Sequence, residues 1–342
     1  MNPVDASPDL SALEFALLNR FQRDFPLQPR PFEVLAQQLG SDEPSVIDHL
    51  RRLQLRGLVS RVGAVFRPNA IGASALAALA VPPDQLETVA ALVSALPEVN
   101  HNYQREHHFN LWFVVAAAST ERLHAVLQQI EAMCHCGAVL VLPLLEDFHI
   151  DLGFDLSMQA GKTFTYTTPQ LPSRDGPGAS LALDGPQQTL VAALQHGLPW
   201  VSRPYAGLGL TEPQALEMIS NWLARGVIKR LGVVVRHHEL GYQANAMAVW
   251  DVPDHLASQI GREVAATGRV TLCYRRNRQL PSWPYNLFCM IHGKDRSDVA
   301  ARIEALSRLC QLDAYPHTVL FSCRRFKQCG ALYAPSAELV HG

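Results

Sequence analysis

The sequence predicts an α+β fold with an internal duplication, in which each copy combines a winged helix-turn-helix unit with a ferredoxin-like βαββαβ domain. The first observation is a repeat. RVGAVFR at 61–67 returns as RLGVVVR at 230–236, and the neighbouring features keep their order. The second is periodicity, because each copy starts with apolar residues at helical spacing and then alternates between strands and helices.

The first part of each copy, over 10–67 and 186–237, is expected to be a helical unit. LSALEFALLNRF at 10–21 places apolar residues at helical spacing. The sequences DEP at 42–44 and TEP at 211–213 are typical of helix starts, with a capping side chain followed by an acid and a proline. A short strand pair follows in each copy and would complete a winged helix-turn-helix.

The second part of each copy, over 72–156 and 241–335, alternates strands and helices in the order βαββαβ. This order gives a four-stranded sheet with both helices on one face. The other face needs a cover, which a duplicated chain supplies by packing its two sheets together as a symmetric dimer would. Residues 157–185 are rich in Gly, Pro, Ser and Thr and are expected to be a linker. We therefore expect a pseudo-dimer within the chain.

The composition argues against several classes of protein. A net charge of −2 gives no general attraction to nucleic acid or to an anionic membrane. The apolar run at 138–145 is too short to span a bilayer. The first residues lack the pattern of a secretion signal, and seven irregularly spaced cysteines suit reduced thiols, so we expect a cytoplasmic protein. The CHC sequence at 134–136 has no second ligand pair at zinc spacing, so we expect no metal site.

A polar segment also occurs twice, as HNYQREHHFNLWFVV at 101–115 and as LCYRRNRQLPSWPYNLFCMIHG at 272–293. Both copies read Tyr-x-Arg, then a short polar stretch, then Asn-Leu and an aromatic residue that opens an apolar strand. Arginine pairs with carboxylates through two parallel hydrogen bonds, and aromatic rings stack on flat ligands. The repeated segments therefore predict a site for a large, flat, anionic and aromatic ligand.

Strand alternation gives these segments a direction. Side chains two residues apart share a face, so His101, Tyr103 and Arg105 lie together, as do Tyr274 and Arg276. This pattern favours a one-sided ligand surface. The copies also differ, because His101 corresponds to a leucine in the second copy.

GVIKRLGVVVRHHELGY at 226–242 resembles the junction between the two domains of Lrp/AsnC regulators, which bind DNA and sense amino acids. A helix that reads DNA must neutralise phosphates. The candidate helix at 43–54 carries two acids and two bases, and its counterpart at 212–225 carries two acids and one arginine. Neither has a basic face, so a DNA-binding regulator is kept only as the alternative.

The two polar segments resemble instead the two subunit types of the Lrp-like sirohaem decarboxylases, which are sometimes fused in one chain. Their order here fits the fused form, and the resemblance covers the whole chain outside the linker. It implies that carboxyl groups are removed from the C12 and C18 acetates of sirohaem, which gives 12,18-didecarboxysirohaem and CO2 in haem d1 or alternative haem biosynthesis. It implies no added cofactor, because the substrate brings its own iron. The resemblance also suggests homologous decarboxylase subunits as partners, and further association of the chain with copies of itself.

Loss of CO2 leaves carbanion character that the macrocycle delocalises, and a nearby acid must then deliver a proton. We expect catalytic roles for His101, His108 and Tyr103. Each could donate the proton, and a histidine could instead bind the substrate's iron. Substrate-binding roles, as carboxylate clamps or pocket walls, are expected for Arg105, Tyr274, Arg275, Arg276 and Trp283. Trp112 lies inside an apolar strand and is expected to belong to the core. A tetrapyrrole sensor without chemistry is a further alternative.

Overall fold

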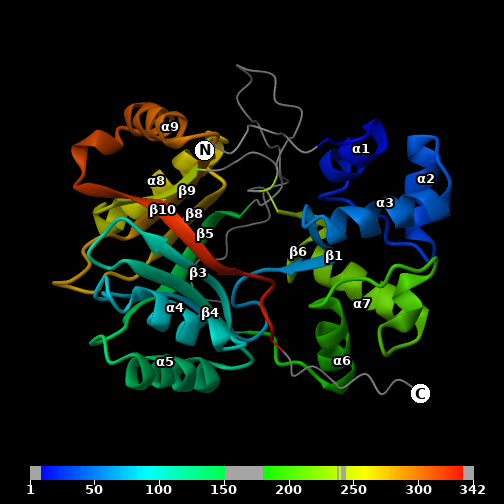
Figure 1. The fold of residues 1–342 in the computed structure, drawn as a ribbon, viewed down its shortest axis with the longest axis horizontal. Coiled ribbons are helices and arrows are strands. Elements are labelled where there is room, and N and C mark those ends of the chain that lie inside the picture. Colours follow the sequence, from blue (N-terminus) through cyan, green and yellow to red (C-terminus); the bar gives the residue numbers. More distant parts are fainter. Residues whose placement is uncertain (1–8, 151–179, 237–238, 240–243, 334–342) are drawn as a thin grey trace.

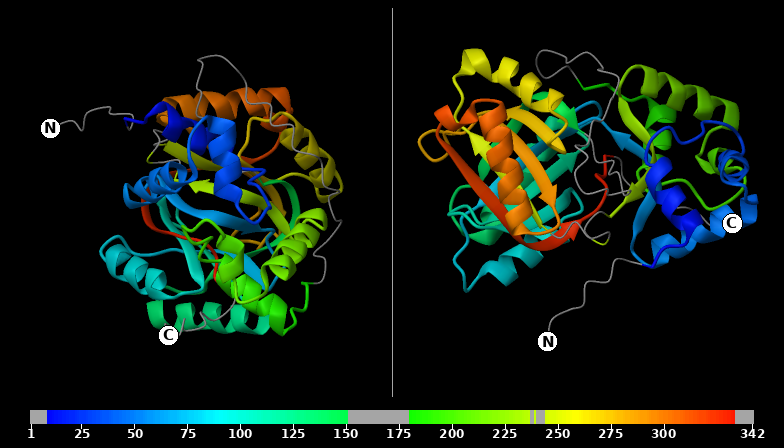
Figure 2. Two further views of the ribbon diagram at one scale, coloured as in Figure 1. Left: turned by 90° about the vertical axis from the view of Figure 1, so that its right-hand side faces the viewer. Right: turned by 90° about the horizontal axis from the view of Figure 1, so that it is seen from above.

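The computed structural model of the 342-residue chain describes residues 9–150, 180–236, 239 and 244–333. Most of the expected linker lies outside these residues. The described parts form two bodies, one of helices and one of strands surrounded by helices, which lie side by side (Figure 1). Strands β1 (Val59–Phe66) and β6 (Ile228–Val235) belong to the helical body and lie on its side toward the barrel of strands (Figures 1 and 2).

Both helical units form, and capped residues start their helices. Ser11 accepts a hydrogen bond from the Glu14 N–H, and Asp42 accepts one from the Ser45 N–H. In the second unit the middle helix is only a 3-10 turn of sequence PYAG, too short for an α-helix. The first unit contains α1 (Ala12–Arg20), α2 (Pro31–Leu39) and α3 (Glu43–Leu55), and the second contains α6 (Gly185–Leu194), η1 (Pro204–Gly207) and α7 (Glu212–Ala224).

The expectation of a strand pair within each helical unit is wrong. Each copy supplies one strand here, and β1 pairs antiparallel with β6, so that Gly63 lies opposite Gly232. Both glycines are needed because backbone of the opposite copy comes close. A Cβ on Gly232 would collide with the carbonyl oxygen of Gln22, and a Cβ on Gly63 would lie 3.1 Å from the Cα of Gly197.

Backbone hydrogen bonds hold this crossed arrangement. The Val233 N–H donates to the Phe21 carbonyl at 2.7 Å, and the Leu198 N–H donates to the Val62 carbonyl at 2.7 Å. The segment after the first helix of each copy therefore docks on the strand of the other copy. A single hydrophobic core unites the two units, and its members include Leu17, Leu50, Val191, Ile219 and Trp222.

The rest of each copy follows the predicted βαββαβ order, which confirms the fold class. The first domain contains β2 (Ala73–Leu79), α4 (Leu86–Ala95), β3 (Val99–Arg105), β4 (Leu111–Ala117), α5 (Thr120–Cys134) and β5 (Leu140–Ile150). The second contains β7 (Ala244–Trp250), α8 (Asp254–Ala266), β8 (Leu272–Arg276), β9 (Leu287–Gly293), α9 (Arg296–Leu309) and β10 (His317–Gln328).

The two sheets join at both edges into one closed barrel, in the order β10-β3-β4-β2-β5-β8-β9-β7, rather than stacking as separate sheets. The cause is the length of the last strand of each domain. Residues 140–143 of β5 pair with β2 of their own sheet, and 144–150 continue onto β8 of the other sheet. Likewise, 317–321 of β10 pair with β7, and 322–328 continue onto β3. Both inner faces therefore look into one interior.

Helices α4 and α5 cover the outside of the first sheet, and α8 and α9 cover the second (Figure 1). A separate apolar core fills part of the interior, and it includes Trp112, Trp283, Phe288, Met247 and Leu142. None of the helices in the described part of the chain is long and apolar enough to cross a membrane.

Candidate functional site

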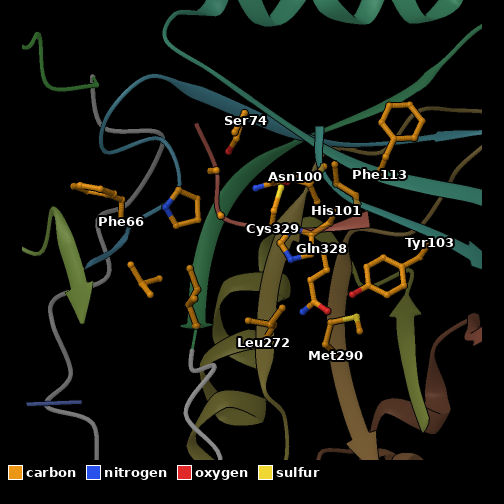
Figure 3. Close-up of a pocket in the computed structure, with 18 of the residues that line it drawn as sticks. Phe66, Ser74, Asn100, His101, Tyr103, Phe113, Leu272, Met290, Gln328 and Cys329 are labelled. Atoms are coloured by element: carbon orange, nitrogen blue, oxygen red, sulfur yellow. The ribbon is translucent and has the colours of Figure 1, made fainter. Parts of the chain in front are cut away.

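A cavity of about 360 Å³ lies at the end of the barrel that faces the helical body. Its walls come from both copies, through strands β3, β4, β8 and β9 of the barrel and strands β1 and β6 of the helical units. Figure 3 shows His101 and Tyr103 around the same space as Leu272 and Met290. The cavity is therefore built where the two halves of the chain meet.

The structure brings the two Tyr-x-Arg pairs together in this cavity. Tyr103 and Arg105 reach it from β3, and Tyr274 and Arg276 reach it from β8. Each guanidinium lies over the ring of its own tyrosine, at 5.7 Å for Arg105 and 5.1 Å for Arg276. Alternation along each strand explains why residues two apart share the cavity.

Arg105 is buried and Arg276 is half-buried, and both cations have only neutral partners among the described residues. Arg105 donates to the Leu320 carbonyl at 3.0 Å and to the Asn245 side-chain oxygen at 3.4 Å, and Arg276 donates to the Leu142 carbonyl at 2.8 Å. Within the described residues neither forms an ion pair with a carboxylate. Burial lowers the pKa of each guanidinium to about 10, so both stay charged at neutral pH. An entering carboxylate would supply the missing counter-charge.

His101 supplies the cavity's imidazole on the β3 side. Its ring stacks nearly parallel to that of Tyr103, with centroids 6.3 Å apart and an angle of 18°. Burial lowers the pKa of His101 from 6.5 to about 4, so the ring is neutral at physiological pH. A neutral imidazole is a good ligand for iron and a poor source of protons.

Two of the expected site residues lie elsewhere. Arg275 points to the outside of the barrel, where it pairs with Asp254 at 3.3 Å and donates to the Ser258 hydroxyl at 3.3 Å. Strand alternation explains this, because its neighbour Arg276 points inward. His108 is exposed in the turn after β3 and contacts Phe109, with ring centroids 5.2 Å apart. Neither side chain lines the cavity.

Trp283 lies in the barrel interior without lining the cavity. It is fully buried and contacts Trp112, Phe288 and Tyr285, with ring centroids 5.1, 6.1 and 5.1 Å away. Trp112 is 2% exposed, which confirms that it is a core residue, and it also lines the cavity. Trp283 therefore supports the wall from behind.

Several residues that line the cavity were not predicted from the sequence. Arg61 and Arg230 come from β1 and β6, and Asn245 and His292 come from β7 and β9. The signal for the first two was the repeated RxGxVxR pattern, which had been interpreted as part of a wing. Among the described residues no three His, Cys, Asp or Glu side chains gather in a way that could hold a metal ion.

The chain is duplicated, carries helix-turn-helix units, and has a ligand cavity inside two joined ferredoxin-like sheets. This is the architecture of an Lrp/AsnC-like ligand-binding protein. The family model for the AsnC-like ligand binding domain matches residues 70–149 and 239–327. The model for the siroheme decarboxylase NirDL-like HTH domain matches residues 14–59.

The siroheme decarboxylase NirDL subunit of Paracoccus denitrificans is 40% identical over 338 residues, which cover 95% of this chain and 98% of that protein. A siroheme decarboxylase of Hydrogenobacter thermophilus is 33% identical, over 93% of each chain. A crystal structure of the siroheme decarboxylase NirDL with an iron-uroporphyrin III analogue matches with a TM-score of 0.66 and 31% identity, over 94% of this chain and 95% of that one. The chain belongs to the sirohaem decarboxylase family.

Proposed function

We propose that this protein decarboxylates sirohaem at the C12 and C18 acetates, giving 12,18-didecarboxysirohaem and CO2 in haem d1 or alternative haem biosynthesis. The observation that carries the proposal is the cavity itself. Arg105 is a buried cation and Arg276 a half-buried one, neither has a carboxylate partner among the described residues, and each lies beside an aromatic ring. The relatives of this chain that share its architecture are siroheme decarboxylases, and one of them has a crystal structure in complex with an iron-uroporphyrin III analogue.

In the proposed reaction the arginines hold the carboxylates that stay on the ring, and the reacting acetate loses CO2. The electron pair left on the methylene carbon is delocalised into the macrocycle, and one proton converts that carbon into a methyl group. Tyr103 and Tyr274 are suitable donors, because burial raises the pKa of both phenols and keeps them protonated. The two tyrosines occupy equivalent strands, so one is available on each side of the cavity.

His101 is proposed as the ligand to the substrate's iron rather than as an acid, because its low pKa leaves it neutral. Trp283 is proposed as support for the wall, through Trp112 and Phe288. We assign no role in the reaction to His108 or Arg275, since neither lines the cavity. No cofactor is required beyond the iron that the substrate carries.

The chain is proposed to work as a pseudo-dimer with one complete cavity, so that no separate homologous subunit is needed to build the site. The helical units serve as packing partners. Gln54 on α3, the helix that would read DNA, accepts a hydrogen bond from Trp200 of the other unit at 2.8 Å. Asp48 and Arg52 on the same helix neutralise each other at 2.7 Å. All seven cysteines are free thiols, as expected in the cytoplasm, where we place the protein.

Anaerobic incubation of the purified protein with sirohaem tests this function, with product mass followed over time. We expect loss of two carboxyl groups as CO2. Binding of sirohaem with no change in mass would instead identify a sensor. Tight binding to random duplex DNA with a steep dependence on salt would support a regulator.

A further inference from the structure

We propose that Arg61, on strand β1 of the first helical unit, binds a carboxylate of the tetrapyrrole, so that the helical body forms the roof of the substrate cavity. This inference rests on the proposed function and extends it from the barrel to the helix-turn-helix units. Arg61 lines the same cavity as Arg105 and Arg276. It is the cavity-lining cation contributed by β1, whereas those two come from the barrel.

The guanidinium of Arg61 is incompletely satisfied. One terminal nitrogen donates to the Ala64 carbonyl at 3.2 Å, and the buried Nε has no hydrogen-bond partner. Within the described residues Arg61 has no ion pair with a carboxylate. Burial also lowers its pKa, which reflects the cost of keeping this cation out of water. A ligand carboxylate would satisfy both the charge and the free N–H.

Two glycines hold the side chain in place. A Cβ on Gly197 would lie 2.8 Å from the Cβ of Arg61, and a Cβ on Gly330 would lie 2.9 Å from its Nη1. Gly197 belongs to the second helical unit, and Gly330 follows β10 of the second ferredoxin-like domain. Arg61 thus comes from one copy and is packed by the other. A guanidinium fixed in this way loses little conformational entropy when it binds a ligand.

The equivalent residue of the second copy is arranged differently. Arg230 donates to the Gln22 carbonyl at 2.5 Å and to the Val233 carbonyl at 3.4 Å, so backbone oxygens of the helical body hold it. Arg61 has a single carbonyl partner. Of these two equivalent arginines, Arg230 is therefore mainly structural and Arg61 is available to a ligand.

The test is a titration with iron uroporphyrin and with iron coproporphyrin, which carries fewer carboxylates, followed by absorbance. We expect Arg61→Met to weaken binding of iron uroporphyrin about 10- to 100-fold, as for loss of a charged hydrogen bond, and to reduce the preference over iron coproporphyrin. The KM for sirohaem should rise while kcat changes little. The control is Arg308→Met, an exposed arginine on α9 that is expected to leave binding unchanged.

Arg61→Met with wild-type affinity for iron uroporphyrin would overturn the inference. If Arg61→Met does not fold, the same titration is carried out with Arg61→Gln. Wild-type affinity for iron uroporphyrin in that variant would also overturn the inference. The binding readout is independent of turnover. A wild-type protein that binds iron uroporphyrin through Arg61 but leaves sirohaem unchanged would refute the proposed function alone.

Discussion

His101 and Leu272 occupy equivalent positions on β3 and β8, and both side chains line the same cavity. Two residues further along each strand the copies agree, with Tyr103 matching Tyr274. The cavity is therefore nearly two-fold symmetric in its tyrosines and arginines but not in its imidazole at this position. A macrocycle whose iron is bound by His101 has one favoured orientation, in which its other face lies toward Leu272.

The first prediction concerns that imidazole. His101→Leu makes the two sides of the cavity alike and removes the proposed iron ligand. We expect the absorption spectrum of bound iron uroporphyrin to change and its affinity to fall at least about tenfold, which corresponds to about 1.4 kcal/mol. A spectrum identical to that of the wild type would remove His101 from the mechanism.

The second prediction concerns pH. In the folded protein the pKa of His101 is lowered from 6.5 to about 4, so between these values the unfolded chain binds a proton that the folded chain does not. This contribution to stability is complete above pH 6.5 and is lost as the pH falls toward 4. Between pH 7 and pH 5 we expect His101 to account for a loss of about 2 kcal/mol. Urea unfolding of the wild type and of His101→Leu at both pH values measures it, and parallel losses in the two proteins would contradict the shift.

The third prediction compares two neighbouring arginines. Arg276→Met should weaken binding of iron uroporphyrin about 10- to 100-fold, because it removes a cation that lines the cavity. Arg275→Met is the matched control. It removes an outward ion pair with Asp254, so binding should stay within about twofold and stability should fall by less than about 1 kcal/mol. Equal effects of the two substitutions on binding would restore Arg275 as a substrate clamp.

The fourth prediction concerns the contact between the copies. Gly232→Ala introduces a Cβ against the Gln22 carbonyl and should lower the free energy of unfolding by about 2–3 kcal/mol. Gly185→Ala is the control, since no atom lies within 4 Å of its Cβ, and it should change stability by less than about 0.5 kcal/mol. Thermal or urea unfolding measures both, and equal stability of the two variants would argue against the tight approach.

The sequence predicted local features well and pairing between distant segments poorly. The βαββαβ order and the inward positions of Tyr103, Arg105, Tyr274 and Arg276 follow from periodicity within one segment. The pairing of β1 with β6 joins segments far apart in the chain, and no pattern within either segment indicates which strand it pairs with. For the same reason the closed barrel was not foreseen, because closure depends on how far β5 and β10 extend beyond their own sheets.

The expected site residues were also predicted well where the signal was local and poorly where it was not. Residues on regular strands could be assigned to a face, whereas His108 lies in a turn, where alternation gives no direction. Arg275 was grouped with Arg276 on residue type alone, although alternation separates them. Arg61 was not predicted because its strand was interpreted as part of a wing of the helical unit.

The crossed docking around Gly63 and Gly232 also bears on stoichiometry. Each half docks on the strand of the opposite half, and each contributes an equivalent strand with a central glycine to this contact. A pair of first halves would bring two copies of His101 to one cavity, and a pair of second halves would bring none. Joining one of each in a single chain makes the correct pairing intramolecular, with an effective concentration on the order of millimolar for short connections. Covalent linkage of one first half to one second half thus fixes one imidazole at this position per cavity.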